Sequence, residues 1–529
     1  MLRSPSSEKV AMALQLPSSD PRPLPTGIHS TDAFHRRPLF AVHPREGTAK
    51  PVVVRSWGEA HALHGSARPE DVNPAYVAAL LRGTDAASVA PYRRIHRMPR
   101  AHQVLIEPDG ALHASPYNPL ATGAGAMPAE QLHAFLRQGL IEHLEQALVG
   151  HSGPIGCEHS SGHDSNAVLG GLVHGVGVPP ERLHTWSQES GGEGPLLEQF
   201  RPFHGLHPAH CHRSDPFDPW RDPDGRLNRE LQVFGAPGQN GGNPLACALL
   251  APQGCTLLFS GFGGDQAISH NANNVPTDLV AQGRWGDLVA WVGGRRRALR
   301  IAAGRALALA HRPWAEGRVL AKTGECPSRD LLERALTEAG QAWLAPHLQD
   351  DYPWELDGYV PQGVSIRRRV LSDWLAVRVD EESRMAAAHG ITMAYPLLDE
   401  RLIATLLHQD PLLFGEGQQR GRLIHRRAFA PFLPQRLQVH AAKGRVPEEG
   451  LETCRQRFME QRRTVLVHHL NAAGSWHPAL RRWWDLEAIR REAETMVDRT
   501  DGTMANLHGV YDAIRTMASL SHWWVGLDG

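Results

Sequence analysis

Short hydrophobic segments that end in small residues mark the middle of this chain. Cys255–Phe259 is a continuous apolar run, which is typical of a strand buried on both faces of a parallel sheet. Residues 155–158 form a similar short strand before a loop rich in Ser and Gly. Residues 183–186 follow at the spacing of one strand–helix–strand unit. The pattern therefore predicts an α/β fold built on a parallel sheet.

The first hundred residues show a different pattern. Leu39–Val42 and Val52–Val54 indicate strands, and His102–Glu107 before a Pro-Asp-Gly turn indicates a hairpin. Asn73–Leu81 favours a helix, with Pro74 near its first position. We therefore expect a β-rich N-terminal region.

A linker and long helical stretches complete the organisation. Gly, Pro and Asn are concentrated at residues 116–125, which suggests a domain boundary there. Residues 127–149 carry leucines at helical spacing, and the pattern is mostly helical from about residue 275 onward. We expect one domain over residues 1–122 and a second over residues 123–529, with a helical C-terminal part.

Length, charge and cysteine content narrow the class of protein. The chain has 529 residues, with 55 Lys and Arg against 56 Asp and Glu. This balance gives no case for binding nucleic acid or a membrane surface. No apolar run reaches the ~18 residues that span a bilayer, and no signal peptide is visible. Six scattered cysteines fit a reducing compartment, so we expect a cytoplasmic protein.

The loop after residue 158 has the composition of a phosphate cradle. It contains Ser160, Ser161, Gly162, His163, Asp164 and Ser165. Small residues let the backbone turn tightly and aim N–H groups at one point, where the following helix adds the positive end of its dipole. Asp164 could hold Mg²⁺ on the same phosphates. The alternative is an ordinary helix N-cap, where aspartate is common.

A second loop of the same kind follows the apolar run that ends at Phe259. It contains Ser260, Gly261, Phe262, Gly263, Gly264 and Asp265. Ligands of open α/β sheets bind at the carboxyl ends of the strands. Asp164 and Asp265 are therefore the candidate metal ligands of a Mg–pyrophosphate site, with Ser160–Ser165 and the Ser and Gly residues at 260–264 around the phosphates.

These motifs resemble those of a known superfamily. The first loop is similar to the Ser-Gly-Gly-x-Asp-Ser loop of ATP-pyrophosphatases. The second resembles the Ser-Gly-x-Gly-x-Asp-Glu segment of asparagine synthetases, β-lactam synthetases and lasso peptide cyclases. His389–Asp399 is similar to their Gly-Val-Glu-x-Arg-x-Pro-Phe-Leu-Asp, and Arg422–Ala428, Leu433-Pro434 and Lys443 follow in the family's order. The chain departs at Ser161, which replaces a Gly, and at Gln266, which replaces a Glu.

The resemblance implies a fold and a reaction. It implies a vestigial glutaminase-like β-rich domain and then an adenylating domain with a parallel sheet and a helical C-terminal part. The cofactors would be ATP and Mg²⁺. A substrate carboxylate would attack ATP and release pyrophosphate, and an amine would then displace AMP to form an amide.

Two residues are candidates for catalysis. Lys443 matches a lysine that stabilises the intermediate in β-lactam-forming relatives. In the segment His389–Asp399, Thr392 replaces the glutamate of the family motif. Threonine cannot act as a general base at neutral pH. We therefore take Glu382, from the acidic run Asp380-Glu381-Glu382, as the candidate base. The alternative is that at least two of these three acidic residues lie on a solvent-exposed face at the start of a helix.

The absence of a cysteine nucleophile from the N-terminal region narrows the choice of substrates. Glutamine-hydrolysing members of the family use a cysteine at position 2 as nucleophile, but this chain has Leu2, and its first cysteine is Cys157. A lasso peptide cyclase is the closest match, with a precursor peptide as partner and possibly a leader peptidase or a leader-binding protein. The alternatives are a small-molecule amide or β-lactam synthetase and a non-catalytic scaffold.

A histidine-rich segment is a weaker metal candidate. His204, His207, His210 and His212 lie close together in the sequence, but their spacing matches no familiar metal motif. Because the chain has 31 histidines, a chance cluster is the simpler interpretation.

The lysine assignment gives a testable prediction. Lys443→Ala should lower the turnover rate roughly 10²- to 10³-fold, because a fixed ammonium would stabilise charge that develops in the transition state. Lys443→Arg should recover only part of the rate, since the guanidinium is planar and bulkier. Steady-state kinetics at varied ATP would check this. A strong loss of ATP affinity with an unchanged rate at saturation would contradict the assignment.

Overall fold

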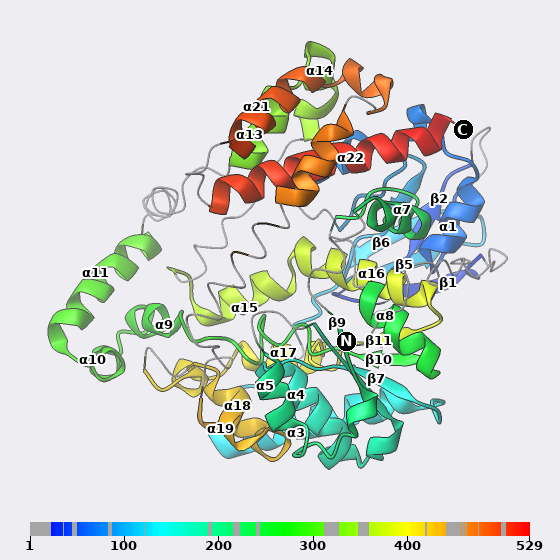
Figure 1. Ribbon diagram of the computed structural model, residues 1–529. Coiled ribbons are helices and arrows are strands. Elements are labelled where there is room, and N and C mark those ends of the chain that lie inside the picture. The colour runs from blue at the N-terminus through cyan, green and yellow to red at the C-terminus, as the bar shows by residue number, and fades with distance from the viewer. Residues whose placement is uncertain are drawn as a thin grey trace, which may run out of the picture.

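The computed structural model gives positions for most of the chain (Figure 1). It describes residues 23–528 except 35, 37, 45–49, 83–86, 122, 189–192, 215–222, 240–243, 311–326, 348–358, 418–420, 441–455, 457–459, 461–462, 474–475 and 499–503. No helix in these described stretches is long and apolar enough to cross a membrane.

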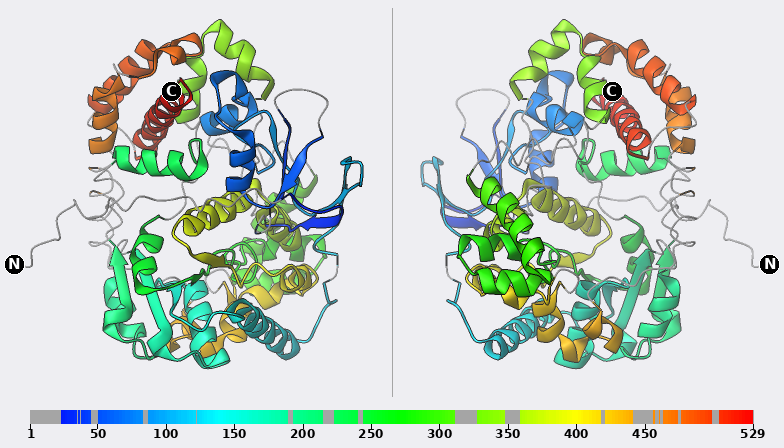
Figure 2. Two further views of the ribbon diagram at one scale, coloured as in Figure 1. Left: turned by 90° about the vertical axis from the view of Figure 1, so that its right-hand side faces the viewer. Right: turned by 90° about the vertical axis from the view of Figure 1, so that its left-hand side faces the viewer.

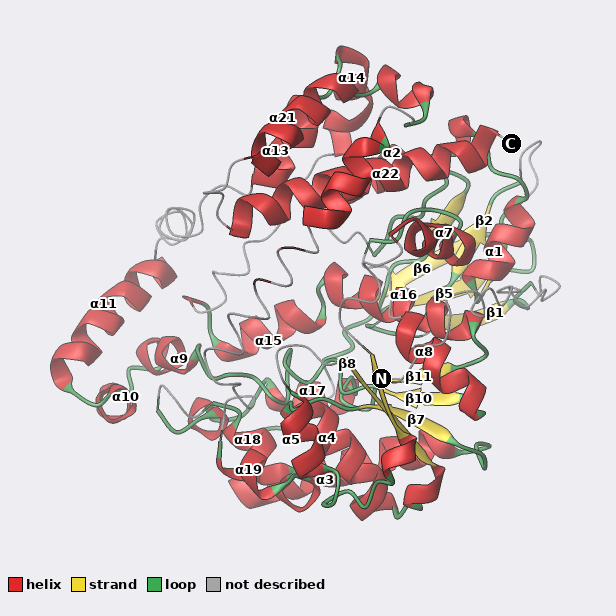
Figure 3. Cartoon of the chain, viewed as in Figure 1, coloured by secondary structure: helices red, strands yellow, loops and turns green. Residues whose placement is uncertain are grey.

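A parallel sheet of five strands forms the centre of one lobe (Figure 3). In chain order its strands are β7 (Ile155–Glu158), β8 (Leu183–Gln188), β9 (Cys211–Ser214), β10 (Leu257–Phe259) and β11 (Thr392–Ala394). All neighbouring pairs are parallel. The predicted strands at β7, β8 and β10 and the α/β fold class are confirmed. β9 and β11 were missed because they are short and lack an apolar run.

The strand order creates a crevice next to β7. The spatial order is β11-β10-β7-β8-β9, so the chain leaves β7 toward β8 on one side and later returns to pair β10 on the other. Connections that diverge in this way leave a gap at the carboxyl ends of the two central strands, where α/β proteins bind ligands. The Ser- and Gly-rich loops follow these two strands.

Helices cover both faces of the sheet because residues alternate between the two sides. Leu257 and Phe259 pack with α3 (Ala129–Leu148) and its neighbours in the largest core, whereas Leu258 packs with α8 (Pro244–Leu250) and α16 (Asp373–Ala388). The predicted helix over residues 127–149 is confirmed as α3.

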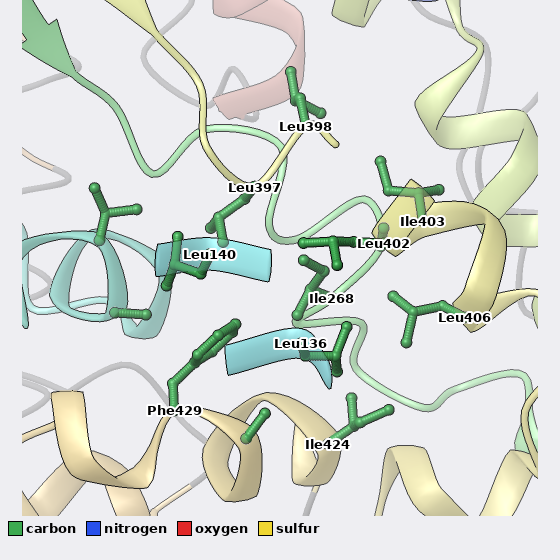
Figure 4. Close-up of a cluster of buried hydrophobic side chains, with 14 of the residues drawn as sticks. Leu136, Leu140, Ile268, Leu397, Leu398, Leu402, Ile403, Leu406, Ile424 and Phe429 are labelled. Atoms are coloured by element: carbon green, nitrogen blue, oxygen red, sulfur yellow. The ribbon is translucent and has the colours of Figure 1, made fainter. Parts of the chain in front are cut away.

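The largest core also fixes the second loop. Figure 4 shows Leu136 and Leu140 of α3 close to Ile268, which follows the second loop, and to Leu402 of α17 (Glu400–Leu406). Ile424 of α18 (Leu423–Ala428) closes the same cluster. Each of these side chains is fully buried, so the loop is attached to the core on the side away from the crevice.

The N-terminal region contains two antiparallel sheets of three strands each. One contains β1 (Gly27–Thr31), β5 (His102–Ile106) and β6 (Leu112–Pro116), and the other contains β3 (Val52–Val54), β2 (Phe40–Val42) and β4 (Ile95–Arg97). A small core with Leu39, Ala41, Val53, Val104 and Ile106 packs between them. The predicted strands, the hairpin and the helix, which is α2 (Pro74–Arg82), are confirmed.

A second large core joins the N-terminal region to the last helices of the chain. Figure 2 shows the blue N-terminal residues beside the light-green helices α13 (Pro327–Arg334) and α14 (Glu338–Leu344) and the red C-terminal helix. Trp57 and Tyr92 share this core with residues of α13, α14, α21 (Leu486–Asp498) and α22 (Met504–Asp528). The indole N–H of Trp523 donates to the Tyr92 hydroxyl at 3.2 Å. The domain boundary at residue 122 stays a prediction, and this core runs across it.

Helices dominate the described chain beyond residue 275, as predicted. The remaining helices there are α9 (Val275–Ala281), α10 (Trp285–Val292), α11 (Arg295–Ala310), α15 (Gln362–Val370) and α19 (Gln435–Val439). Four further helices precede them in the described chain, α1 (Trp57–His64), α4 (His163–Gly170), α5 (Gly194–Phe200) and α7 (Pro223–Phe234).

The acidic run on α16 is buried, so the alternative of a solvated helix start is wrong. Asp380, Glu381 and Glu382 are at most 7% exposed and lie in the middle of the helix. Asp380 accepts from Arg97 of β4 and from Arg384, each at 2.6 Å. Burial is possible because each carboxylate is paired: Asp380 and Glu381 accept from donors distant in the sequence, and Glu382 accepts from Arg378 on the same helix.

The buried ion pair between Arg97 and Asp380 predicts a stability effect. Arg97→Ala should lower the free energy of unfolding by about 3 kcal/mol, the lower end of the range for breaking a buried pair, because Arg384 still contacts Asp380. Arg68→Ala, which removes an exposed pair with Glu70, should cost less than about 1 kcal/mol. Urea unfolding followed by Trp fluorescence would measure both. Equal midpoints for the two variants would contradict the assignment.

Candidate active site

The first loop is held in shape by Asn166. The side-chain amide donates to the carbonyl oxygens of Ser160 at 2.8 Å and Gly162 at 2.7 Å. The Ser165 hydroxyl accepts the N–H of Ser160 at 3.1 Å. Gly162 is the N-cap residue of α4 (His163–Gly170). The loop therefore surrounds the N-terminus of α4, where the helix dipole favours an anion.

Neither candidate aspartate is a helix N-cap. Asp164 lies in the first turn of α4 after the cap at Gly162, and Asp265 lies in a series of turns rather than at a helix start. The N-cap interpretation is therefore wrong for both. Ser161 does not have a positive φ, so its substitution for the family's Gly costs no backbone strain.

Glycines allow the two loops to touch. A Cβ atom on Gly264 would overlap the Asp164 carboxylate, and one on Gly261 would lie 2.6 Å from the Ser165 nitrogen. Gly263 has a φ of +98° and faces Leu398 so closely that a side chain would overlap it. Only glycine fits these positions, which explains why the second loop has three of them.

Asp164 has the properties of a metal ligand. It is buried, and its Oδ1 forms no hydrogen bond, although His425 Nε2 lies 3.3 Å away. Burial opposes ionisation, but His425 and Arg422 together keep the pKa of Asp164 below its ordinary value. An ionised carboxylate oxygen with no donor, beside the bare backbone of Gly264, fits Mg²⁺, which prefers oxygen ligands.

Asp265 faces the crevice from the other loop. Its Oδ1 accepts from Arg422 at 2.6 Å and from the Ser269 hydroxyl at 3.3 Å. Arg422 also lies 3.3 Å from His163 Nδ1, so it connects the two loops, and its φ of 61° is rare for a non-glycine residue. Arg422 was part of the family resemblance, but sequence reasoning gave it no role.

The two loops line one pocket of about 430 Å³. It brings together Ser160, Gly162, Asp164 and Ser165 of the first loop with Gly261, Gly263 and Asp265 of the second. Its other walls are Glu158, His159, Trp186, Gln188, Glu193, Phe262, Gln266, Trp374 and Arg378. Ser161, His163, Ser260 and Gly264, which were also predicted, lie in the same loops without forming the pocket surface.

An internal carboxylate already contacts the cradle. The N–H of Ser161 donates to Glu193 Oε2 at 3.1 Å. The first loop therefore donates a backbone N–H to an anionic side chain of the protein itself, while phosphate binding there stays a prediction.

Glu158 is a pocket residue that sequence reasoning missed. It is the last residue of β7, and its carboxylate accepts the hydroxyl proton of Ser260. Burial and the nearby Glu382 raise the pKa of Glu158 to about 7, against the opposing effects of Ser260 and Arg378. The available signal was a charged residue at the end of an otherwise buried strand.

Glu382 lies behind Glu158 rather than on the pocket surface. It accepts from Arg378 Nε at 2.8 Å and from the Tyr395 hydroxyl at 3.3 Å. Its role as the base stays a prediction, but of these two glutamates Glu158 is the one that lines the pocket. Thr392 is exposed at the start of β11, away from the carboxyl ends of the strands.

For two other predicted sites, the described part of the structure shows no residue in the pocket. Lys443 lies outside the described residues. The histidine-rich segment divides into two groups: His204 contacts Asn166 at 3.0 Å, whereas His210 and His212 stack on His184. Within the described part of the chain, three potential ligands come together only at Asp224, His468 and His469, in another part of the fold.

The contact between the loops gives a prediction. Gly264→Ala should lower turnover at least about 10²-fold, because the added methyl group must displace the Asp164 carboxylate. A small displacement of a group in the active site is enough to slow the reaction by this factor. Gly286→Ala in α10 is the control, since its Cβ would meet nothing within 4 Å. Activity and circular dichroism of both variants would be measured. Full activity in Gly264→Ala would show that the loops do not act together.

Comparison with known proteins agrees with this geometry. Residues 243–523, just over half of the chain, match the family asparagine synthase. The match includes the second loop and the segments His389–Asp399 and Arg422–Ala428. β7 and the first loop precede it. A search of curated proteins gives no match. The chain belongs to the asparagine synthase family, whose members are ATP-dependent amide-bond-forming ligases.

Proposed function

We propose that this protein closes a ring in a peptide by joining a side-chain carboxylate to the peptide's own N-terminal amine. The carboxylate is first converted to an acyl-adenylate with release of pyrophosphate, and the amine then displaces AMP. The observation that carries the proposal is the single pocket that places two phosphate-type loops beside a buried, ionisable carboxylate.

The phosphate end of the pocket acts in the first step. The N-terminus of α4 and the hydroxyl groups of Ser160 and Ser165 bind the pyrophosphate as it leaves. Asp164 and Asp265 are placed to hold Mg²⁺, which supplies positive charge to the phosphates when it is bound. Arg422 keeps Asp265 oriented toward the first loop.

Two features support a peptide substrate. Residues 1–122 contain no cysteine, so this region lacks the nucleophile that would release ammonia from glutamine. A second hollow of about 440 Å³ lies beside the cradle, with Phe203 and Val439 exposed in it. His440 lines this hollow, and its carbonyl oxygen contacts His163 of the first loop at 2.9 Å. A peptide with its carboxylate in the pocket needs such a surface for its remaining residues.

The same features count against a non-catalytic scaffold. Ser161 does not have a positive φ, so it does not strain the first loop, and Asp164 and Asp265 both line the shared pocket.

The reaction predicts AMP as the nucleotide product. With Mg²⁺, ATP and the short peptides encoded near its gene, the protein should form AMP and pyrophosphate in step with a peptide that has lost one water molecule. The N-terminal amine of that product should no longer react with acylating reagents. Chromatography of nucleotides and mass spectrometry would measure this. Substrate-dependent ADP would contradict the mechanism, and AMP formed with a free carboxylate in place of any peptide would point to a small-molecule synthetase.

Glutamine should not serve as nitrogen donor. We expect no glutamate from labelled glutamine during turnover, because no cysteine is present in residues 1–122. An amino-acid assay run alongside AMP detection would check this. Glutamate formed in proportion to AMP would overturn the assignment of the N-terminal region.

A further inference from the structure

The pocket lining also includes residues that have no role at the phosphates. Beyond Glu158 its walls are Trp186 of β8, Phe262 of the second loop and Trp374 of α16. Phe262 and Trp374 meet edge to face with ring centroids 5.6 Å apart. The Arg378 guanidinium lies 4.2 Å from the centre of the Phe262 ring. Three aromatic side chains therefore line the same pocket as the Glu158 carboxylate, and we call these four residues the aromatic end of the pocket.

The charges at this end do not balance. Glu158 and Glu382 carry two negative charges when ionised, and Arg378 supplies one positive charge to both. The Ser260 and Tyr395 hydroxyl groups add hydrogen bonds but no charge. One unit of negative charge remains next to a surface of aromatic rings. This combination suits a cation, because buried charges are stable when paired and aromatic faces attract cations.

We propose that Glu158 binds the ammonium group of the attacking amine and removes its proton before the amine attacks the acyl-adenylate. This inference rests on the proposed function, and it assigns the general base to a residue outside the matched family region. Glu382 is then a positioning residue, which acts through Arg378 and through its charge on Glu158.

The proton and bond changes are as follows. Glu158 takes one proton from the ammonium group and becomes a neutral acid. The freed lone pair forms the C–N bond with the acyl carbon. The bond from that carbon to the AMP phosphate oxygen breaks, and its electron pair leaves with AMP. The second proton of the nitrogen passes to solvent as the amide forms.

The acidity of the base favours one class of amine. Burial and Glu382 raise the pKa of Glu158 to about 7. A peptide α-amino group has a pKa of about 7.7–8.0, so proton transfer to Glu158 is nearly balanced. A lysine side chain, with a pKa of about 10.4, holds its proton too strongly. The pocket therefore selects the N-terminal amine of a peptide over a lysine amine.

The groups around Glu158 account for its titration. Glu382 and Arg378 face it from α16, and Tyr395 faces it from the segment after β11. Cys157 precedes it on β7 and Cys247 approaches from α8, and burial raises the pKa of both thiols so that they stay neutral. Glu158 is therefore the group that changes charge near pH 7 at this end of the pocket.

The test compares Glu158→Gln with Asp278→Asn in the full-length protein. Asp278 of α9 is a matched control: burial also raises its pKa, to about 6, but it accepts from the Gln362 N–H instead of lining the pocket. For each protein, carboxylate-dependent exchange of labelled pyrophosphate into ATP reports adenylation. Cyclised peptide reports the full reaction, which is followed from pH 5.5 to pH 9.

Wild type and Asp278→Asn should show a rate of cyclisation that falls below about pH 7. Glu158→Gln should keep pyrophosphate exchange but lose about 10²- to 10⁴-fold in cyclisation, and its remaining rate should fall below about pH 8, because only the free amine can then react. Hydroxylamine, which is largely neutral at pH 7 and needs no base, should trap the acyl-adenylate of Glu158→Gln at the wild-type rate.

Three results would overturn the inference, and one of them would reassign the residue. Glu158→Gln with normal cyclisation and an unchanged pH profile would remove Glu158 from the reaction. Failure of hydroxylamine to trap the adenylate despite normal exchange would also contradict the role of base. Loss of exchange through a higher KM for ATP would identify Glu158 as a nucleotide contact. If wild type itself shows no carboxylate-dependent exchange, the proposed function is what fails.

Discussion

The contact between Gly264 and Asp164 is the constraint on which the site depends. It joins the loop after β10 to the loop after β7, and no residue with a Cβ fits at position 264. The diverging connections of β7 and β10 open the crevice, while Ile268 and Leu398 anchor the second loop in the main core. Hydrophobic packing on one side thus holds two polar loops together on the other. The unsatisfied oxygen of Asp164 is retained at this contact.

Helix α16 connects the site to the rest of the molecule. Asp380 pairs with Arg97 of the N-terminal region, and Glu381 accepts the Gln239 N–H at 2.8 Å. One residue further on, Glu382 is paired with Arg378 behind the pocket. Successive positions on a helix point in different directions, so neighbouring carboxylates can serve an interface and the site. The N-terminal region, although it lacks a cysteine, therefore supports the helix that places Arg378.

The features that sequence predicted are those fixed by neighbouring residues. An apolar run followed by Ser and Gly identifies β7, β10 and their loops, because buried strands and tight turns need those residue types locally. The environment of Glu158 could not be predicted in this way, since its pKa depends on Glu382 and Arg378 from another element. The acidic run was misread for the same reason: its partner Arg97 comes from the other end of the chain. The core shared by Trp57 and Trp523 likewise has no local signal.

In the proposed reaction, Asp164 and Asp265 hold one divalent cation on the phosphates of ATP. The most direct measurement replaces Mg²⁺ with Mn²⁺ and records electron–nuclear double resonance of the ternary complex with a non-hydrolysable ATP analogue. If the aspartates bind this ion, the spectrum should show ³¹P coupling together with ¹³C coupling from protein labelled at its aspartate carboxylates. Asp164→Asn should weaken the carboxylate signal. Phosphorus coupling with no ¹³C coupling, and an unchanged spectrum in Asp164→Asn, would contradict metal binding by the aspartates.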